Sequence, residues 1–156
     1  MIIASCLASG KTTLSNCAIE PEIKDLVNFL IKMGCNIKWT TKRTIKIEGV
    51  VNLSETKYQV MPDRIEAGTY LIAAALSEGN LKVVGIDPKI INTEINILKK
   101  VGAKIIKKKN EILIQGSKKI KSINIKTSPY PGSVSYTHLR AHETDSYLVC
   151  RLLLEK

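Results

Sequence analysis

Two short charged runs are the parts of this sequence whose residue types and spacing could do chemistry. They are Glu20-Pro21-Glu22 and Asp63-Arg64-Ile65-Glu66, and each opens a predicted helix. Carboxylates in the first turn of a helix are stabilised by the positive end of the helix dipole, which is a structural reason for these acids. The arginine could also pair with a neighbouring acid, and an exposed ion pair contributes little stability. From the residues alone, the role of both runs stays open.

Three other patterns could suggest a ligand, but each lacks a required part. Residues 8–13 match the end of a phosphate-binding loop, yet Ser5 stands where that motif needs glycine, and a strand is predicted where it needs a helix. His138 and His142 are spaced for zinc without an evident third ligand. The four cysteines show no metal-binding spacing, and those at 6, 17 and 35 are predicted to be core residues. We therefore expect no metal site, and no cofactor is implied.

Helix start and stop signals predict the elements that position the charged runs. Between Pro62 and Gly79, residues 67–77 carry no charged side chain, which predicts a helix too apolar for the surface and too short to cross a membrane. Between Pro21 and Gly34, a second helix has one apolar stripe, formed by Ile23, Leu26, Val27, Leu30 and Ile31. Each charged run therefore lies at the first turn of a helix.

Glycines and prolines recur along the chain with a period of about 67 residues. The matched pairs are Gly10 and Gly79, Pro21 and Pro88, Gly34 and Gly102, Gly49 and Gly116, and Pro62 and Pro129. Each repeat unit is predicted to contain a buried helix, a strand, an amphipathic helix and three strands. The third strands are expected to end at Val60 and to span 120–126. Strand, crossover helix and strand form a right-handed unit whose sheet the later strands can extend. The fold class is α/β, with helices inside and sheets outside.

The net charge of +10 comes mostly from lysine. Residues 99–126 contain ten lysines and a single acid, Glu111. Such a segment could bind nucleic acid, an anionic membrane or a phosphorylated substrate. No aromatic side chain lies among these lysines for base stacking, so a solubilising role is favoured. The cysteine pattern fits a reducing cytosol, and neither a signal segment nor a membrane-spanning run is present, so we expect a cytoplasmic protein that needs no membrane.

Several motifs, in order and at matching spacing over about residues 1–132, resemble the UDP-N-acetylglucosamine 1-carboxyvinyltransferases, which are enolpyruvyl transferases. They are Glu20-Pro21-Glu22-Ile23, Phe29-Leu30, Met33-Gly34, Pro62-Asp63-Arg64-Ile65-Glu66-Ala67-Gly68-Thr69, Ala73-Ala74-Ala75 and Thr127-Ser128-Pro129-Tyr130-Pro131-Gly132. The resemblance implies two inside-out α/β barrels of three units each, as in EPSP synthase, of which this chain holds only part. It also implies transfer of enolpyruvyl from phosphoenolpyruvate to the 3'-hydroxyl of UDP-N-acetylglucosamine, in peptidoglycan synthesis.

The resemblance places the two charged runs near the substrate cleft. Its candidate cleft residues are Glu20, Glu22, Asp63, Arg64 and Glu66. The cysteine-bearing loop of the family precedes the matched stretch, and Ser133-Val134-Ser135 replaces the segment that carries the acidic base. No catalytic residue is therefore assigned, and the chain by itself is expected to be inactive.

The same resemblance gives the expected domain limits. Residues 1–60 are the last unit of the first domain, 61–132 are the first unit of the second, and 133–156 are a tail foreign to the family. Two alternatives stay open: an enzyme of the 5-enolpyruvylshikimate-3-phosphate synthase type, and a basic nucleic-acid-binding module. The first is weakened by the Asp-Arg-Ile-Glu run, and nucleic acid is not the expected partner. No obligate protein partner is inferred.

Overall fold

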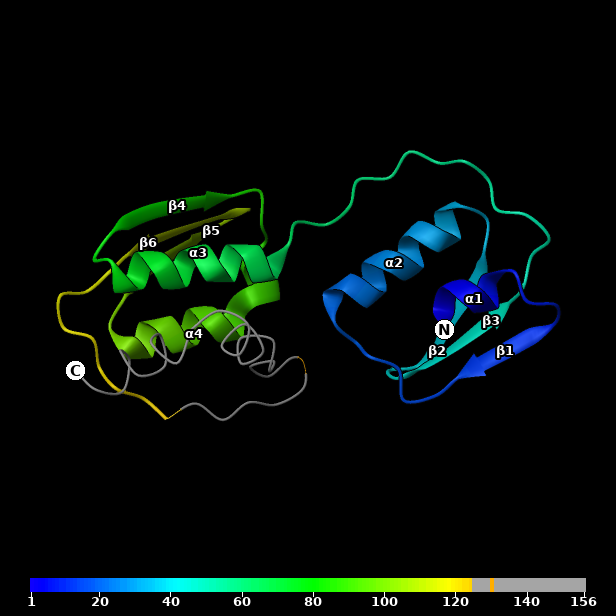
Figure 1. The fold of residues 1–156 in the computed structure, drawn as a ribbon, viewed down its shortest axis with the longest axis horizontal. Helices are drawn as coiled ribbons and strands as arrows, with labels where there is room; N and C mark the ends of the chain where they lie inside the picture. The colour runs from blue at the N-terminus through cyan, green and yellow to red at the C-terminus, as the bar shows by residue number, and fades with distance from the viewer. Residues whose placement is uncertain (125–129, 131–156) are drawn as a thin grey trace. The chain divides into compact units, whose positions relative to one another are not determined.

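The structure is a computed structural model that describes residues 1–124 and residue 130 (Figure 1). The chain divides into two compact units, Met1–Met61 and Pro62–Lys156. Each unit is described by itself. His138, His142 and the predicted tail lie outside the described residues.

The first unit pairs two helices with a three-stranded sheet. Its elements are α1 (Ile2–Cys6), β1 (Lys11–Leu14), α2 (Pro21–Lys32), β2 (Asn36–Thr41) and β3 (Thr44–Glu48). The strand order is β1-β3-β2, and β3 runs antiparallel to both neighbours. Strands β1 and β2 are therefore parallel to each other, and the later strand fills the space between them instead of extending an edge.

The second unit repeats this arrangement. Its elements are α3 (Arg64–Leu76), β4 (Asn80–Val84), the short 3-10 helix η1 (Pro88–Ile91), α4 (Asn92–Val101), β5 (Lys104–Lys108) and β6 (Glu111–Gln115). The strand order is β4-β6-β5, and β6 runs antiparallel to both of its neighbours. Asp87 begins the 3-10 turn by accepting a hydrogen bond from the main-chain N–H of Lys89 at 2.9 Å, and Gly102 ends α4 in the left-handed conformation.

Each unit has two layers, with helices covering one face of the sheet and the other face exposed (Figure 1). In β3, Ile45 and Ile47 are buried while Lys46 and Glu48 are exposed, as the period of two in a strand requires. In the second unit, Ile112 and Ile114 of β6 pack with Leu71 of α3. The predicted mixture of helices and sheets is confirmed, and the described residues form no closed barrel.

The predicted repeat extends to individual hydrogen bonds. Gly49 donates its N–H to the carbonyl of Gly10 at 3.0 Å, and Gly116 donates to Gly79 at 2.9 Å. The end of the second helix also recurs, because the N–H of Cys35 bonds Leu30 and that of Ala103 bonds Leu98, both at 3.0 Å. Matched glycines thus occupy equivalent places in the two units.

The predicted third strand of each unit is wrong. Residues 49–63 form no strand. Four of their backbone groups instead bond to α1, to α2 or to Met33 at the end of α2, and they belong to Val50, Ser54, Lys57 and Met61. In the second unit, residues 116–124 form no strand, since the N–H of Lys121 bonds the carbonyl of Val101 at the end of α4. Residues 125 and 126 lie outside the described residues. The strand predicted after the loop-like residues 8–13 is β1, which begins at Lys11 and ends at Leu14.

Helix α3 is buried along one face only. Ala67, Leu71, Ala74 and Ala75 are in the core, whereas Glu66, Thr69, Tyr70 and Ala73 are exposed, and 57% of Tyr70 is accessible. The expectation that this helix is covered on nearly every face is not met within this chain. Among the described residues, no helix has the length and apolar character needed to span a membrane.

Candidate functional site

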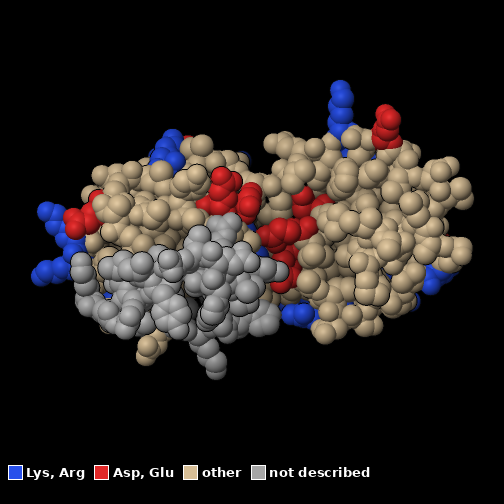
Figure 2. All heavy atoms as spheres, in the orientation of Figure 1, with Lys and Arg blue, Asp and Glu red and all other residues tan. Residues whose placement is uncertain are grey.

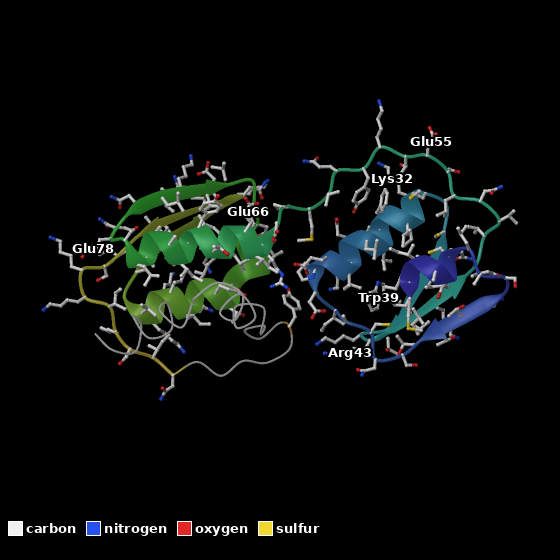
Figure 3. The ribbon with its side chains drawn as sticks, in the orientation of Figure 1. Lys32, Trp39, Arg43, Glu55, Glu66 and Glu78 are labelled. Atoms are coloured by element: carbon white, nitrogen blue, oxygen red, sulfur yellow. The ribbon has the colours of Figure 1, made fainter. Side chains whose placement is uncertain are left out.

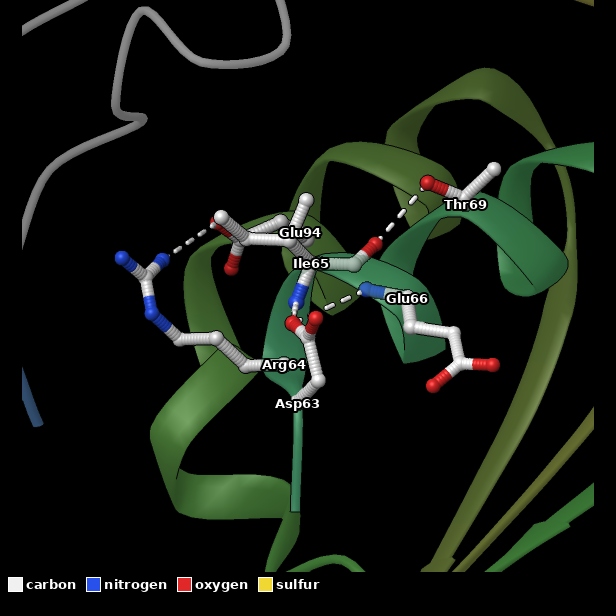
Figure 4. A network of polar contacts seen from close by, with 6 residues as sticks. All are labelled: Asp63, Arg64, Ile65, Glu66, Thr69 and Glu94. Carbon is white, nitrogen blue, oxygen red and sulfur yellow. Dashed lines mark hydrogen bonds and ion pairs between the residues drawn. The ribbon is translucent and has the colours of Figure 1, made fainter. Parts of the chain in front are cut away.

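Asp63 is the N-cap of α3. Its Oδ1 accepts hydrogen bonds from the main-chain N–H groups of Ile65 at 2.7 Å and Glu66 at 3.2 Å (Figure 4). These bonds satisfy two of the donors that a helix start leaves unpaired. The Asp63 carboxylate, a candidate cleft group, therefore caps the helix. Both capping bonds use Oδ1, and Oδ2 takes no part in them.

Arg64, the first residue of α3, is a buried cation with only 5% of its surface exposed. Its Nη1 lies 4.0 Å from Oε1 of Glu94, whose side chain is 17% exposed. The guanidinium carbon also lies 5.5 Å from the centre of the Tyr130 ring, within the range of a cation–π contact. A buried charge needs such partners, because leaving it unpaired in the interior is costly.

Glu94 was not among the residues predicted from the sequence. It lies in the first turn of α4, thirty positions after Arg64, so no local spacing connects the two residues. The signal that singled out Glu22, an acid in the first turn of a helix, also applies to Glu94 and could have found it. Tyr130 belongs to the last motif of the family resemblance.

Glu66 is exposed on α3, and in Figure 4 its carboxylate points away from the Arg64 guanidinium. The same close-up shows Thr69, whose hydroxyl donates to the carbonyl of Ile65 at 2.8 Å. Arg64 therefore pairs with Glu94 across two helices, and Glu66 keeps an accessible carboxylate one turn into α3.

Glu20 and Glu22 lie at the start of α2 in the first unit. Glu20 is the N-cap residue but makes no side-chain capping bond, Pro21 occupies the first turn, and both acids are half-buried. Oε2 of Glu20 is buried and has no hydrogen-bond partner in the part of the chain that the structure describes. Burying an unpaired carboxylate oxygen costs free energy, and helix capping does not account for this oxygen.

Cys6 and Cys35 are core residues, as predicted, and Cys17 is partly buried against the same cluster. Cys6 is fully buried, and Cys35 is 4% exposed in the same cluster. Burial, a hydrogen bond with the Cys35 thiol and the nearby charge that thiol can carry raise the pKa of Cys6 from 9.0 to about 12. A thiol held protonated in this way is a poor nucleophile. No group of three or more potential ligands that could hold a metal ion occurs among the described residues.

Comparison with known proteins decides the family. Residues 1–146 match the sequence profile of EPSP synthase (3-phosphoshikimate 1-carboxyvinyltransferase). The chain belongs to this enolpyruvyl transferase family. The membership of the enolpyruvyl transferases that the resemblance implied is thereby confirmed. The solved enolpyruvyl transferase NikO from Streptomyces tendae matches 88% of this chain and 33% of its own, with a TM-score of 0.72 and 22% identity. EPSP synthase from Acinetobacter baumannii matches 80% of this chain and 30% of its own, with a TM-score of 0.54 and 24% identity.

Curated relatives within the family are more similar in sequence. The UDP-N-acetylglucosamine 1-carboxyvinyltransferase of Pelagibacter ubique is 85% identical over 132 residues, which are 85% of this chain and 32% of the relative. The enzyme of the same name from Geotalea daltonii is 45% identical over the same coverage. This enolpyruvyl transferase chain thus spans about a third of the length of the curated relatives it matches.

Proposed function

We propose that this chain is part of a UDP-N-acetylglucosamine 1-carboxyvinyltransferase, which transfers enolpyruvyl from phosphoenolpyruvate to the 3'-hydroxyl of UDP-N-acetylglucosamine. The 85% identity over 132 residues to a protein of that name carries the proposal. This reaction would give the parent protein a place in peptidoglycan synthesis, and so in cell shape and cell division, with its substrates in the cytoplasm.

The alternatives are not favoured. The EPSP synthase neighbour is 24% identical, against 85% and 45% for transferases that act on UDP-N-acetylglucosamine by name. A nucleic-acid-binding module is not favoured either, since two of the described lysines are engaged within the second unit. Lys82 pairs with Glu111 at 3.0 Å and Lys107 donates to Asn92 at 3.0 Å. On the face drawn in Figure 2, lysine and arginine stand in separate small groups.

The proposed limits are residues 1–60 for the last unit of the first domain, 61–132 for the first unit of the second, and 133–156 for a tail outside the enzyme. Matches to curated relatives span 131 or 132 residues, the length expected for a limit near 132, whereas the family-profile match extends to residue 146. Within these limits, Glu20, Glu22, Asp63, Arg64 and Glu66 are the proposed cleft residues. The buried, unpaired oxygen of Glu20 supports its place in that set, and the buried Arg64–Glu94 pair supports a fixed cation at the start of α3.

The proposal is tested with a chimaera in which residues 1–132 of this chain replace the matched third of the Pelagibacter ubique relative. We expect this chimaera to release phosphate from phosphoenolpyruvate when UDP-N-acetylglucosamine is the acceptor, and the 156-residue chain alone to release none. A chimaera that melts cooperatively, like its parent, but transfers nothing would refute the proposal. Turnover by the isolated chain would refute the expectation that it lacks essential groups.

The cleft assignment has its own test in the same chimaera. Glu20→Gln preserves the shape of the side chain and removes its charge, so we expect kcat/KM to fall by about tenfold or more, the order of one charged hydrogen bond. Glu55→Gln makes the same change at an exposed residue of the irregular segment 49–63 and is the control (Figure 3). Equal values of kcat/KM for the two variants would refute the assignment of Glu20 to the cleft.

A further inference from the structure

The segment that joins β3 to α3 is long, irregular and attached to α2. Residues 49–63 contain neither helix nor strand. Such connections are uncommon in compact domains, and their polar backbone groups need partners. Two partners come from the end of α2: the carbonyl of Met33 accepts from the N–H of Ser54 at 2.8 Å, and Nζ of Lys32 donates to the carbonyl of Lys57 at 2.6 Å. Figure 3 shows Lys32 on α2.

Asp25, on α2, holds the last part of this segment with both oxygens of its carboxylate. Its Oδ1 accepts from the Tyr58 hydroxyl at 2.8 Å, and its Oδ2 accepts from the main-chain N–H of Met61 at 3.3 Å. The Tyr58 hydroxyl also lies 3.2 Å from the carbonyl oxygen of Asp25. One side chain thus fixes two residues that are three positions apart.

The Tyr58 ring strengthens this attachment. Its centre lies 5.2 Å from that of Phe29, at an interplanar angle of 54°, and 5.9 Å from Nζ of Lys32. Asp25, Phe29 and Lys32 are spaced by four and three residues, so they share one face of α2. The hydrogen bond to Asp25, followed by burial and the charge of Asp25, raises the pKa of the Tyr58 hydroxyl. The hydroxyl therefore stays a donor at neutral and moderately alkaline pH.

The position of this attachment in the chain gives it a consequence for the proposed cleft. Met61 is the last residue of the first unit, Pro62 has a fixed φ, and Asp63 caps α3 with two hydrogen bonds. Two residues of chain span at most about 7 Å, so an anchored Met61 restricts where the chain can begin α3.

We propose that Asp25 is a positioning residue: its carboxylate fixes Tyr58 and Met61 on α2, and thereby sets the point at which the chain enters the Asp63–Arg64 helix start. This inference rests on the proposed function, because Asp63 and Arg64 are proposed cleft residues. Asp25 is not expected to contact either substrate.

Amide hydrogen exchange of the 156-residue chain tests the attachment without any assay of activity. We expect Asp25→Ala to speed exchange of the Met61 amide by about tenfold, as the loss of a hydrogen bond to a charged group implies, and to leave the amides of β2 and β3 unchanged. Tyr58→Phe keeps the Met61 bond and should have a smaller effect. Lys24→Ala, an exposed neighbour on α2, is the control. An unchanged Met61 rate, or faster exchange throughout the first unit, would overturn the proposal.

Kinetics of the chimaera test the consequence. We expect Asp25→Ala to lower kcat/KM by about tenfold, since small displacements of positioning groups are costly. We expect Asp25→Asn, whose single amide oxygen can replace one of the two acceptors, to fall between Asp25→Ala and the unsubstituted chimaera. Kinetics of Asp25→Ala equal to those of Lys24→Ala would overturn the positioning role. An unsubstituted chimaera without transfer would instead count against the proposed function, so the two failures are distinguishable.

Discussion

Two glycines of the second unit should respond oppositely to the same substitution. Gly116 follows β6, and a Cβ built there would lie 2.6 Å from the carbonyl oxygen of Ala74, 2.7 Å from the Cα of Glu78 and 3.0 Å from the carbonyl oxygen of Ala75. All three atoms are backbone, which cannot move aside as a side chain can. Gly68 lies in the middle of α3, and a Cβ there would meet nothing within 4 Å.

The expected magnitudes follow from these distances. Gly116→Ala must move the end of β6 away from the end of α3 by roughly 0.8 Å to reach an ordinary contact, at a cost of about 2 kcal/mol of the unfolding free energy. Gly68→Ala should stabilise the chain by about 0.5 to 1 kcal/mol, because alanine is the better helix former. The two variants, each one methyl group larger than the parent, should therefore differ by about 3 kcal/mol.

Urea unfolding followed by circular dichroism at about 222 nm measures this difference. With a slope of about 1.5 kcal/mol/M, the two midpoints should lie about 2 M apart. Trp39, the one tryptophan of the chain, belongs to the first unit, so its fluorescence serves as an internal control. A neutral Gly116→Ala, or equal losses in the two variants, would refute the close backbone approach at Gly116.

Two further predictions concern stability. Asp63→Ala should cost about 1 kcal/mol of the unfolding free energy because α3 loses its cap, whereas Asp63→Asn keeps a capping oxygen and should be nearly neutral; similar urea midpoints for the two variants would contradict the capping role. The Cys6 pKa of about 12, against 9.0 for an ordinary thiol, means that above pH 9.0 the unfolded chain ionises while the folded thiol stays protonated. The free energy of unfolding should then fall by about 1.4 kcal/mol per pH unit up to pH 12, relative to Cys6→Ala. Urea titrations between pH 8 and pH 10 should show a total fall of about 1.4 kcal/mol, because the unfolded thiol begins to ionise near pH 9.0, and parallel curves for the two proteins would contradict it.

The parts of the fold that the sequence predicted are those that local backbone geometry dictates. Glycine at 102 permits the left-handed end of α4, and glycine at 116 permits the close approach to α3. Gly49 has the same role at the end of the first sheet, where a Cβ would overlap the carbonyl group of Ala8. Because both units need glycine at equivalent places, the spacing of glycines disclosed the repeat before any family was considered.

The predictions that were wrong or incomplete concern residues whose partners lie far away in the sequence. A third strand was predicted to end at Val60, but the N–H of Ser54 and the carbonyl of Lys57 bond to groups at the end of α2. Likewise, Arg64 pairs with Glu94 on another helix, and no spacing rule connects residues thirty positions apart. Of the candidate site, the sequence could therefore supply the helix starts, but not the partners that fix them.

Helix α3 has an uncharged composition but is only partly buried. Residues 67–77 carry no charge, yet Tyr70 and Ala73 are exposed within this chain. In repeat architectures, each unit buries its apolar surface against neighbouring units, so the composition of a helix is suited to the whole array. The chain spans about a third of the length of its curated relatives. An uncharged but exposed helix face is compatible with a chain that spans only part of its relatives' length, whereas the prediction of nearly complete burial is not met among the described residues.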